Sequence, residues 1–162
     1  MKSAKVMLLG DIGVGKSSLA RRLVFDHFEA DYKTTIGVDV LTHDISLGAD
    51  SGGETLRFVL WDTDGDFGLR IFETVYMAGA AAAIIVADAA RPGTLIKQAE
   101  LAHGFAEKFP GRPLARIVNK IDLRPEARDV GGPDAVYTSA RTGEGVEEMF
   151  LDVGRAIWRR GL

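Results

Sequence analysis

The sequence predicts an α/β fold in which helices cover both faces of a six-stranded, mostly parallel sheet. Short apolar runs alternate with helical stretches along the 162 residues, as in doubly wound folds. Ala80 to Ala87 is nearly uncharged, which is typical of a strand buried on both faces. Glycine-rich or polar segments follow several of the expected strands, at the sheet edge where such folds bind ligands.

The expected elements follow the chain in order. Strands are expected at residues 5–9, 38–47, 56–61, 80–87, 114–118 and 134–138. Helices are expected at residues 17–25, 92–109 and 145–160, and Pro92 suits a helix's first turn. The turn from Gly48 to Gly53 is too short for a parallel crossover, so one strand must run antiparallel to its neighbour.

The composition is that of a soluble globular protein. Hydrophobic residues make up 46% and charged residues 27% of the chain, and the length predicts a single domain over residues 1–162. The net charge of −3 gives no electrostatic footprint for nucleic acid. The absence of cysteine excludes disulfides, thiolate metal sites and cysteine-linked lipids. No apolar run spans a bilayer and no signal peptide precedes the first strand, so we expect a cytoplasmic location.

A phosphate-binding loop is expected directly after the first strand. Gly10 to Ser17 matches the pattern G-x-x-x-x-G-K-[ST], in which glycines let backbone N–H groups turn towards phosphate oxygens. Lys16 would reach the β- and γ-phosphates, and Ser17 would bind Mg²⁺. The alternative is a glycine-rich turn that caps a helix, and the pattern does not select a base. The expected nucleotide contacts here are Asp11, Ile12, Gly13, Val14, Gly15, Lys16, Ser17 and Ser18.

A base-reading motif follows the fifth expected strand. Asn119-Lys120-Ile121-Asp122 ends in a carboxylate, which can accept two hydrogen bonds from guanine but finds no such donor pair on adenine. The motif resembles the N-K-x-D of the Ras-like GTPases. That resemblance implies that Asp122 reads guanine, that Lys120 lays its stem on the base and that Asn119 ties the loops together. On its own, the motif could equally be an exposed loop.

Further nucleotide contacts are implied by the same resemblance. Ser139-Ala140-Arg141 resembles the family's S-A-K segment, so the Ala140 N–H would meet the guanine oxygen, and Arg141 would pack as the usual lysine does. Phe28 stands where the family has an aromatic residue against the base edge. Tyr32 and Leu123 complete the expected set of nucleotide contacts.

Two switch segments resemble those of Rab proteins. Thr35 opens a T-I-G-V-D run, and Trp61-Asp62-Thr63-x-Gly65 resembles the family's W-D-T-A-G. Thr35 and Asp62 would hold Mg²⁺, Asp62 through water, and Gly65 would donate its N–H to the γ-phosphate. The resemblance therefore implies GTP or GDP with Mg²⁺ as cofactors. The alternatives are a strand-flanking threonine and a helix-capping aspartate.

A partner surface is implied over Thr34 to Val40 and Trp61 to Tyr76. Rab effectors use three hydrophobic side chains there, and the matching positions are Val40, Trp61 and Tyr76. Val40 replaces the usual phenylalanine, so we expect an altered surface for protein effectors or regulators. The alternative is that these are ordinary half-buried residues.

Three departures from the family cluster around the γ-phosphate. Asp66 replaces the water-positioning glutamine, Asp64 replaces an alanine, and Ile12 replaces a small residue. An ionised aspartate only accepts hydrogen bonds and adds negative charge, so we expect slow hydrolysis. The opposing hypothesis is that Asp64 or Asp66 activates the water. The expected catalytic residues are Lys16, Thr35, Asp64, Gly65 and Asp66.

The chain is also shorter than its relatives in two places. Only seventeen positions separate Asp122 from Ser139, fewer than in the Ras-like GTPases, which carry a helix in this segment. We therefore expect that this helix is lost or greatly shortened. At most one turn fits, at residues 125–128. The sequence ends after the last expected helix with no cysteine-bearing tail, and we expect no lipid anchor. The richness in Ala and Gly favours a prokaryotic source.

Two functions remain open. The first is a P-loop NTPase of the G-domain type that switches between GTP and GDP, with slow GTP hydrolysis. The second is a hydrolysis-deficient module that holds GTP or GDP and serves as a scaffold. Ile12, Asp64 and Asp66 favour the module, whereas Ser17, Thr35 and Asp62 favour the switch. An ATPase is disfavoured by Asp122.

Overall fold

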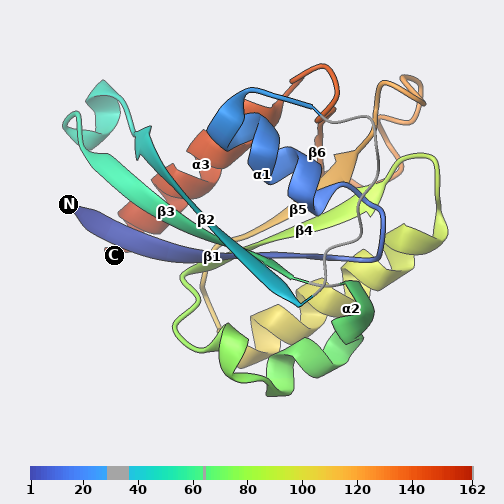
Figure 1. The fold of residues 1–162 in the computed structure, drawn as a ribbon, viewed down its shortest axis with the longest axis horizontal. Helices are drawn as coiled ribbons and strands as arrows, with labels where there is room; N and C mark the ends of the chain where they lie inside the picture. Colours follow the sequence, from blue (N-terminus) through green and yellow to red (C-terminus); the bar gives the residue numbers. More distant parts are fainter. Residues whose placement is uncertain (29–36, 64, 162) are drawn as a thin grey trace.

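The fold is a six-stranded sheet with helices on both faces (Figure 1). The structure is a computed structural model, and it describes residues 1–28, 37–63 and 65–161. The strands are β1 (Lys2–Gly10), β2 (Val38–Ser46), β3 (Thr55–Thr63), β4 (Ala82–Asp88), β5 (Leu114–Asn119) and β6 (Val136–Tyr137). The α-helices are α1 (Lys16–Phe25), α2 (Gly93–Lys108) and α3 (Val146–Arg159). Three short 3₁₀ helices are η1 (Ala49–Ser51), η2 (Gly65–Glu73) and η3 (Val75–Met77).

The sheet is mostly parallel with one antiparallel strand, as predicted. Its strand order is β2-β3-β1-β4-β5-β6. The β2–β3 pair is antiparallel and the other four pairs are parallel. This confirms the single antiparallel strand inferred from the short turn, in which η1 now lies. All seven residues of β4 are buried, because β4 lies inside the sheet and is covered on both faces.

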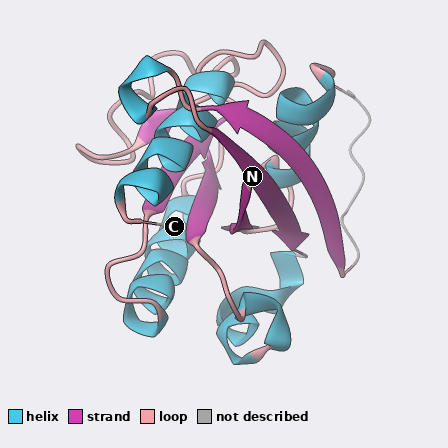
Figure 2. Ribbon diagram, turned by 90° about the vertical axis from the view of Figure 1, so that its left-hand side faces the viewer, coloured by secondary structure: helices cyan, strands magenta, loops and turns pink. Residues whose placement is uncertain are grey.

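Two hydrophobic layers hold the helices to the sheet. On one face, α1 and α3 pack through Leu19 and Phe150 against Phe58 of β3. On the other face, Ile71 of η2 and Phe105 of α2 pack among the buried residues of β1 and β4. Figures 1 and 2 show α2 on the opposite side of the sheet from α1 and α3. The sheet is therefore fixed from both sides, which gives the loops at its edge a rigid base.

The predicted loss of a helix is confirmed. Residues 123–135 contain only turns between β5 and β6. Arg116 donates to the Gly131 carbonyl at 3.0 Å, and the Gly131 N–H donates to the Tyr137 hydroxyl at 3.1 Å. These bonds replace helical packing with a short braced loop.

Two local features differ from the expected elements. β6 is shorter than residues 134–138, because the Ala135 N–H bonds to Gly132 in a turn and only Val136 and Tyr137 pair with β5. Residues 65–77 form the 3₁₀ helices η2 and η3, where no element was expected. η2 is kinked at Gly68, with φ 53° and ψ −142°, a backbone conformation that glycine adopts most easily.

Candidate functional site

The predicted site residues gather at the carboxyl ends of the parallel strands. The glycine-rich loop follows β1, and Asp62 is the last residue but one of β3. Asn119 is the last residue of β5, and Ser139 follows β6. Ligands of open α/β sheets bind at this edge. The four segments come from distant parts of the chain and are joined by side-chain hydrogen bonds.

The loop between β1 and α1 depends on glycine. Gly15 caps α1 in the left-handed region with φ 102° and ψ 24°. A Cβ at Gly15 would lie 2.3 Å from the Asn119 amide nitrogen, and a Cβ at Gly10 would lie 2.5 Å from the Val86 carbonyl oxygen. At these two positions the loop therefore passes too close to β4 and to the base motif for a side chain. It delivers the positive end of α1 to the site, as anion binding requires.

Lys16 lies across the loop. Its side chain is buried, and its ammonium donates to the carbonyls of Gly10 and Asp11, at 3.0 Å each. These bonds hold a positive charge beside the backbone amides of the loop, as a polyphosphate site needs.

Ser17 and Asp62 place two oxygen ligands together. The Ser17 hydroxyl donates to the carboxylate of Asp62, which is buried. A hydroxyl and a carboxylate are ligands that suit Mg²⁺, which takes hard oxygen donors and substrate phosphates. The donor set therefore fits the expected metal. The third expected ligand, Thr35, lies outside the described residues.

Asn119 and Lys120 connect the base motif to the phosphate loop. The Asn119 amide donates to Val14 O at 3.0 Å, and its oxygen accepts from the Thr138 hydroxyl at 3.0 Å and the Ala140 N–H at 3.2 Å. The Lys120 ammonium donates to Gly13 O at 2.6 Å. Asn119 thus ties the loops as expected.

Lys120 is also held by a buried carboxylate. Its ammonium lies 3.0 Å from Asp88 Oδ2 at the end of β4. Its backbone has φ +67°, which is uncommon for a residue with a side chain and is typical of strained functional positions.

Asp122 is oriented by the last loop of the site. Its Oδ1 accepts from the Ser139 hydroxyl at 2.8 Å, and Ser139 Oγ accepts from the Thr142 N–H at 3.1 Å. The Arg141 guanidinium lies 4.0 Å from Asp122 Oδ2. Asp122 and Ala140 are therefore held in one cluster, as a base-reading site requires.

The other expected base contacts are less closely gathered. Phe28 is half-buried against the core beneath α1. Leu123 and Arg141 are exposed, so both can reach a ligand at the surface. Tyr32 lies outside the described residues, as do Thr34 and Asp64.

Gly65 packs directly against Ile12. A Cβ at Gly65 would lie 2.6 Å from the Ile12 nitrogen and 2.8 Å from its Cγ1. The Ile12 N–H donates to Asp11 Oδ1 at 2.8 Å, and Arg91 donates to the Ile12 carbonyl at 2.8 Å. The start of η2 and the phosphate loop are therefore in contact through the unusual isoleucine.

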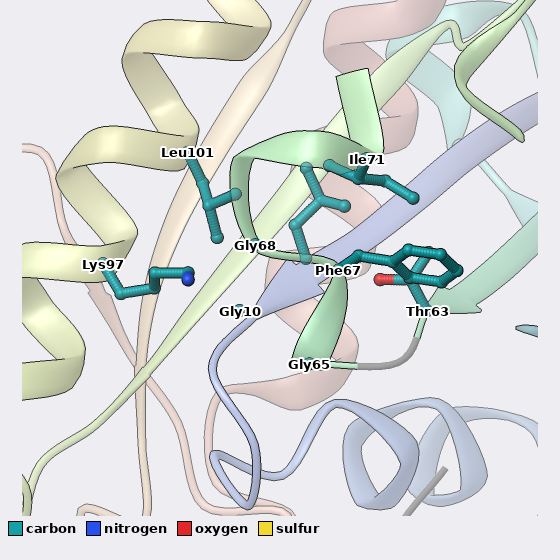
Figure 3. Close-up of a pocket in the computed structure, with 9 residues that line it drawn as sticks. Gly10, Thr63, Gly65, Phe67, Gly68, Ile71, Lys97 and Leu101 are labelled. Atoms are coloured by element: carbon teal, nitrogen blue, oxygen red, sulfur yellow. The ribbon is translucent and has the colours of Figure 1, made fainter. Parts of the chain in front are cut away.

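Gly65 also lines a small pocket (Figure 3). Gly10 and Gly65 line it from the loop side, and Lys97 and Leu101 line it from α2. The Lys97 ammonium would lie 3.1 Å from a Cβ at Gly68. Because Gly68 has no side chain, the Lys97 ammonium has room at the wall of the pocket.

The chain is similar to known proteins over nearly its full length. Residues 5–122 match the family described as "Ras of Complex, Roc, domain of DAPkinase". Human Ras-related protein Rab-31 is 33% identical to it over 169 residues, spanning 97% of this chain and 84% of the relative. The chain belongs to the Ras-like small GTPases. Within them it resembles Rab proteins, including Rab-22A of Mus musculus at 32% identity, with the same shares covered, and RABF2b of Arabidopsis thaliana at 33% over 97% of this chain and 82% of the relative.

The expected partner positions of this small GTPase lie partly together. Trp61 and Tyr76 have ring centroids 6.1 Å apart, and Phe67 is 5.9 Å from Tyr76. Val40 faces Trp61 in the β2–β3 register and is 48% exposed. The Lys5 ammonium lies 3.9 Å from the Trp61 ring centroid, and burial lowers the pKa of Lys5. The rings of Trp61, Phe67 and Tyr76, with the Lys5 ammonium against Trp61, thus form an aromatic cluster next to β2.

Several residues at the site of this small GTPase could not be identified from sequence motifs. Arg91 reaches Ile12 across 79 positions of the chain, and Arg22 reaches Ala140 across 118. Asp88 is the last residue of a buried strand, and this position is the one sequence signal that could have identified it as a site residue. Arg22 and Arg91 belong to no motif, and only the fold brings them to the site.

None of the helices in the described ranges is both long and apolar enough to cross a membrane.

Proposed function

We propose that this chain is a guanine-nucleotide switch that binds GTP or GDP with Mg²⁺ and hydrolyses GTP slowly. The observation that carries the proposal is the link between the phosphate loop and the base motif. Asn119 bonds to Val14 and Lys120 bonds to Gly13. Such bonds hold the expected phosphate site and the expected base site together, as a nucleotide that spans both would need. The chain acts as one G domain in this proposal.

Each half of the site has its own role. Lys16 and the loop amides would neutralise the β- and γ-phosphates, and Gly65 would donate to the γ-phosphate. Ser17, Thr35 and Asp62 would hold Mg²⁺, which neutralises charge on the phosphates. The remaining contacts bind the nucleoside, and they are Phe28, Tyr32, Asn119, Lys120, Asp122, Leu123, Ser139, Ala140 and Arg141.

The reaction is an in-line attack of water on the γ-phosphorus. The bond from that phosphorus to the β–γ bridging oxygen breaks, and GDP and phosphate leave. Asp66 stands where a glutamine would orient the water, and a carboxylate cannot donate as an amide does. We therefore propose a rate no faster than that of unassisted Ras-type hydrolysis, about 10⁻⁴ s⁻¹.

A hydrolysis-deficient binding module is the second candidate. The contact between Ile12 and Gly65 favours it, because a branched side chain against Gly65 crowds the place where water and a partner's arginine would enter. Asp64 and Asp66 bear on the same question, since either could instead have taken over water activation.

Partners would read the two switch segments. The exposed Val40 and the Trp61–Tyr76 aromatic pair support a hydrophobic partner surface next to β2. Its occupant would be a protein effector or regulator whose contact depends on the nucleotide state.

One experiment separates the two functions. The purified protein is denatured, and the released nucleotide is chromatographed before and after incubation with GTP and Mg²⁺. Conversion of bound GTP to GDP within hours supports the enzyme. Bound GTP that persists for many hours supports the module, and the absence of any bound guanine nucleotide contradicts both.

A single-turnover series then assigns the aspartates. Hydrolysis well above 10⁻⁴ s⁻¹ that is lost in Asp66→Ala or Asp64→Ala would show that a carboxylate activates the water. An unchanged slow rate in both variants would support the slow-hydrolysis proposal.

A further inference from the structure

Arg22 of α1 holds the loop that carries Ala140. Its Nε donates to Ala140 O at 2.8 Å, and its NH2 group donates to Arg141 O. The guanidinium is a rigid planar fork, so two bonds to consecutive carbonyls fix the two peptide planes that follow Ala140 and Arg141. These planes come directly after the one that carries the Ala140 N–H. The side chain is only 17% exposed, which strengthens these charge-assisted bonds relative to bonds in water.

The loop turns beside the stem of this arginine. Gly143 has φ +89°, and a Cβ there would make an ordinary contact, 3.8 Å from Arg22 Cδ. The Gly143 N–H donates to Ser139 O at 2.8 Å. The turn thus closes on itself beside the arginine stem, while the guanidinium holds its outer carbonyls.

Arg22 also lies on the helix that begins with the phosphate-binding residues. Lys16 and Ser17 form the first turn of α1, and Arg22 lies in its last turn. The base-reading segments are therefore tied to the phosphate side at three places. Asn119 bonds to Val14, Lys120 bonds to Gly13, and the third tie runs through α1 to the Ala140 and Arg141 carbonyls.

We propose that Arg22 is a positioning residue: by anchoring the peptide unit after Ala140, it helps to direct the Ala140 N–H, which also donates to Asn119 Oδ1 at 3.2 Å, towards the guanine 6-oxygen, and so contributes to base selection. This inference rests on the proposed guanine-nucleotide function. Asp122 would read the opposite edge of the base, through the ring N–H and the 2-amino group. Arg22 makes no direct bond to Asp122, which accepts from Ser139, so the contributions of the two base edges can be measured separately.

Three diphosphates test this separation. GDP carries both features, 6-thioguanosine diphosphate replaces the 6-oxygen by sulfur, and inosine diphosphate lacks the 2-amino group. Affinities are measured by displacement of a fluorescent GDP from wild type, Arg22→Gln and Arg22→Lys. In Arg22→Gln we expect GDP to bind about tenfold more weakly. Its preference for GDP over the thio analogue should shrink, and its preference for GDP over inosine diphosphate should stay unchanged.

Two further variants serve as controls for this experiment. Arg22→Lys keeps the charge but loses the fork, so it should show a smaller shift in the same direction and covers the case in which Arg22→Gln does not fold. Asp26→Asn removes the exposed ion pair of Arg22, at 3.3 Å, and leaves both carbonyl bonds, so all three affinities should match wild type. Asparagine also tolerates the left-handed backbone at this position, where φ is 51°.

The outcomes are distinct. If both base preferences survive in Arg22→Gln, or if both shrink equally, Arg22 is only a structural brace and the inference is wrong. If wild type binds none of the diphosphates, the proposed function itself fails.

Discussion

Gly15 lies where the phosphate loop passes directly against the base motif. Its φ of +102° is left-handed, and a Cβ would lie 2.3 Å from the Asn119 amide nitrogen. The substitution Gly15→Ala therefore combines backbone strain with displacement of the Asn119–Val14 bond. We expect destabilisation of about 1–3 kcal/mol and a fall in GDP affinity of more than tenfold, measured by thermal unfolding and nucleotide displacement.

A second glycine provides the control. Gly52 has φ +69° with nothing within 4 Å of a Cβ, so Gly52→Ala carries the backbone strain alone. It should lower stability without changing GDP affinity. Equal GDP affinities in Gly15→Ala and wild type would contradict the role given to this contact.

Individual site residues could be predicted from the sequence wherever the chemistry requires a particular residue type. Lys16, Asp62, Asn119 and Ser139 lie at the predicted sheet edge because parallel strands end there together. Arg22 was not predictable, because its bond partners are carbonyls that any residue could supply.

At the scale of elements, α2 receives the Phe72 ring of η2 in a gap left by Gly104. A Cβ at Gly104 would lie 2.6 Å from that ring, and Lys108 donates to the Phe72 carbonyl. Glycine to alanine within a helix normally stabilises it by about 1 kcal/mol. In Gly104→Ala we expect the reverse, a loss of about 1 kcal/mol from overpacking, with faster amide hydrogen exchange over residues 65–77.

The first residue of the same helix serves as its control. Gly93 has nothing within 4 Å of a Cβ, so Gly93→Ala should leave hydrogen exchange in η2 unchanged and should not destabilise the protein. Slower or unchanged exchange over residues 65–77 in Gly104→Ala would count against the docking of Phe72.

The β2–β3 pair carries an exposed ion pair that makes a small contribution dependent on pH. Asp44 faces Arg57 in the register, with Nε–Oδ1 at 2.7 Å and NH2–Oδ2 at 3.0 Å. The hydrogen bond from Arg57 lowers the pKa of Asp44 from 3.8. The stabilisation is therefore present above pH 3.8 and is lost as the pH falls through the lowered folded-state pKa.

Asp44→Asn should therefore lower the melting temperature slightly at neutral pH and low salt, and this difference should vanish in acid and in high salt. Asp50→Asn, in the adjoining turn, removes the same charge without this partner. A difference from wild type that is independent of pH would show that the substitution acts through something other than the charge.

The elements themselves were largely predictable, because strand burial and helix periodicity set their order. The exceptions have local physical causes. β6 is short because Ala135 bonds within a turn, and η2 forms where Ile71 must be buried but the kink at Gly68 interrupts regular α-helix. Neither a turn bond nor a kink leaves a periodic signal in the sequence.

For the whole molecule, removal of nucleotide is the most general test. A ligand at a thousand times its Kd adds about 4 kcal/mol to stability, and in a domain of this size each kcal/mol shifts Tm by roughly 2–4 °C. Stripping with chelator and phosphatase should therefore lower Tm by on the order of 10 °C. GDP with Mg²⁺ should restore it and ATP should not. A Tm indifferent to GDP would contradict nucleotide binding as the basis of stability.

The difference in length between the two border strands affects how the sheet can meet other chains. β6 offers two paired residues at one border, whereas β2 offers nine at the other. Strand addition needs a row of backbone N–H and C=O groups, and very short border strands discourage it. Extension of this sheet by a foreign strand is therefore favoured at β2. Since β2 also carries the exposed Val40, an added strand and a partner that reads Val40 would compete for the same border.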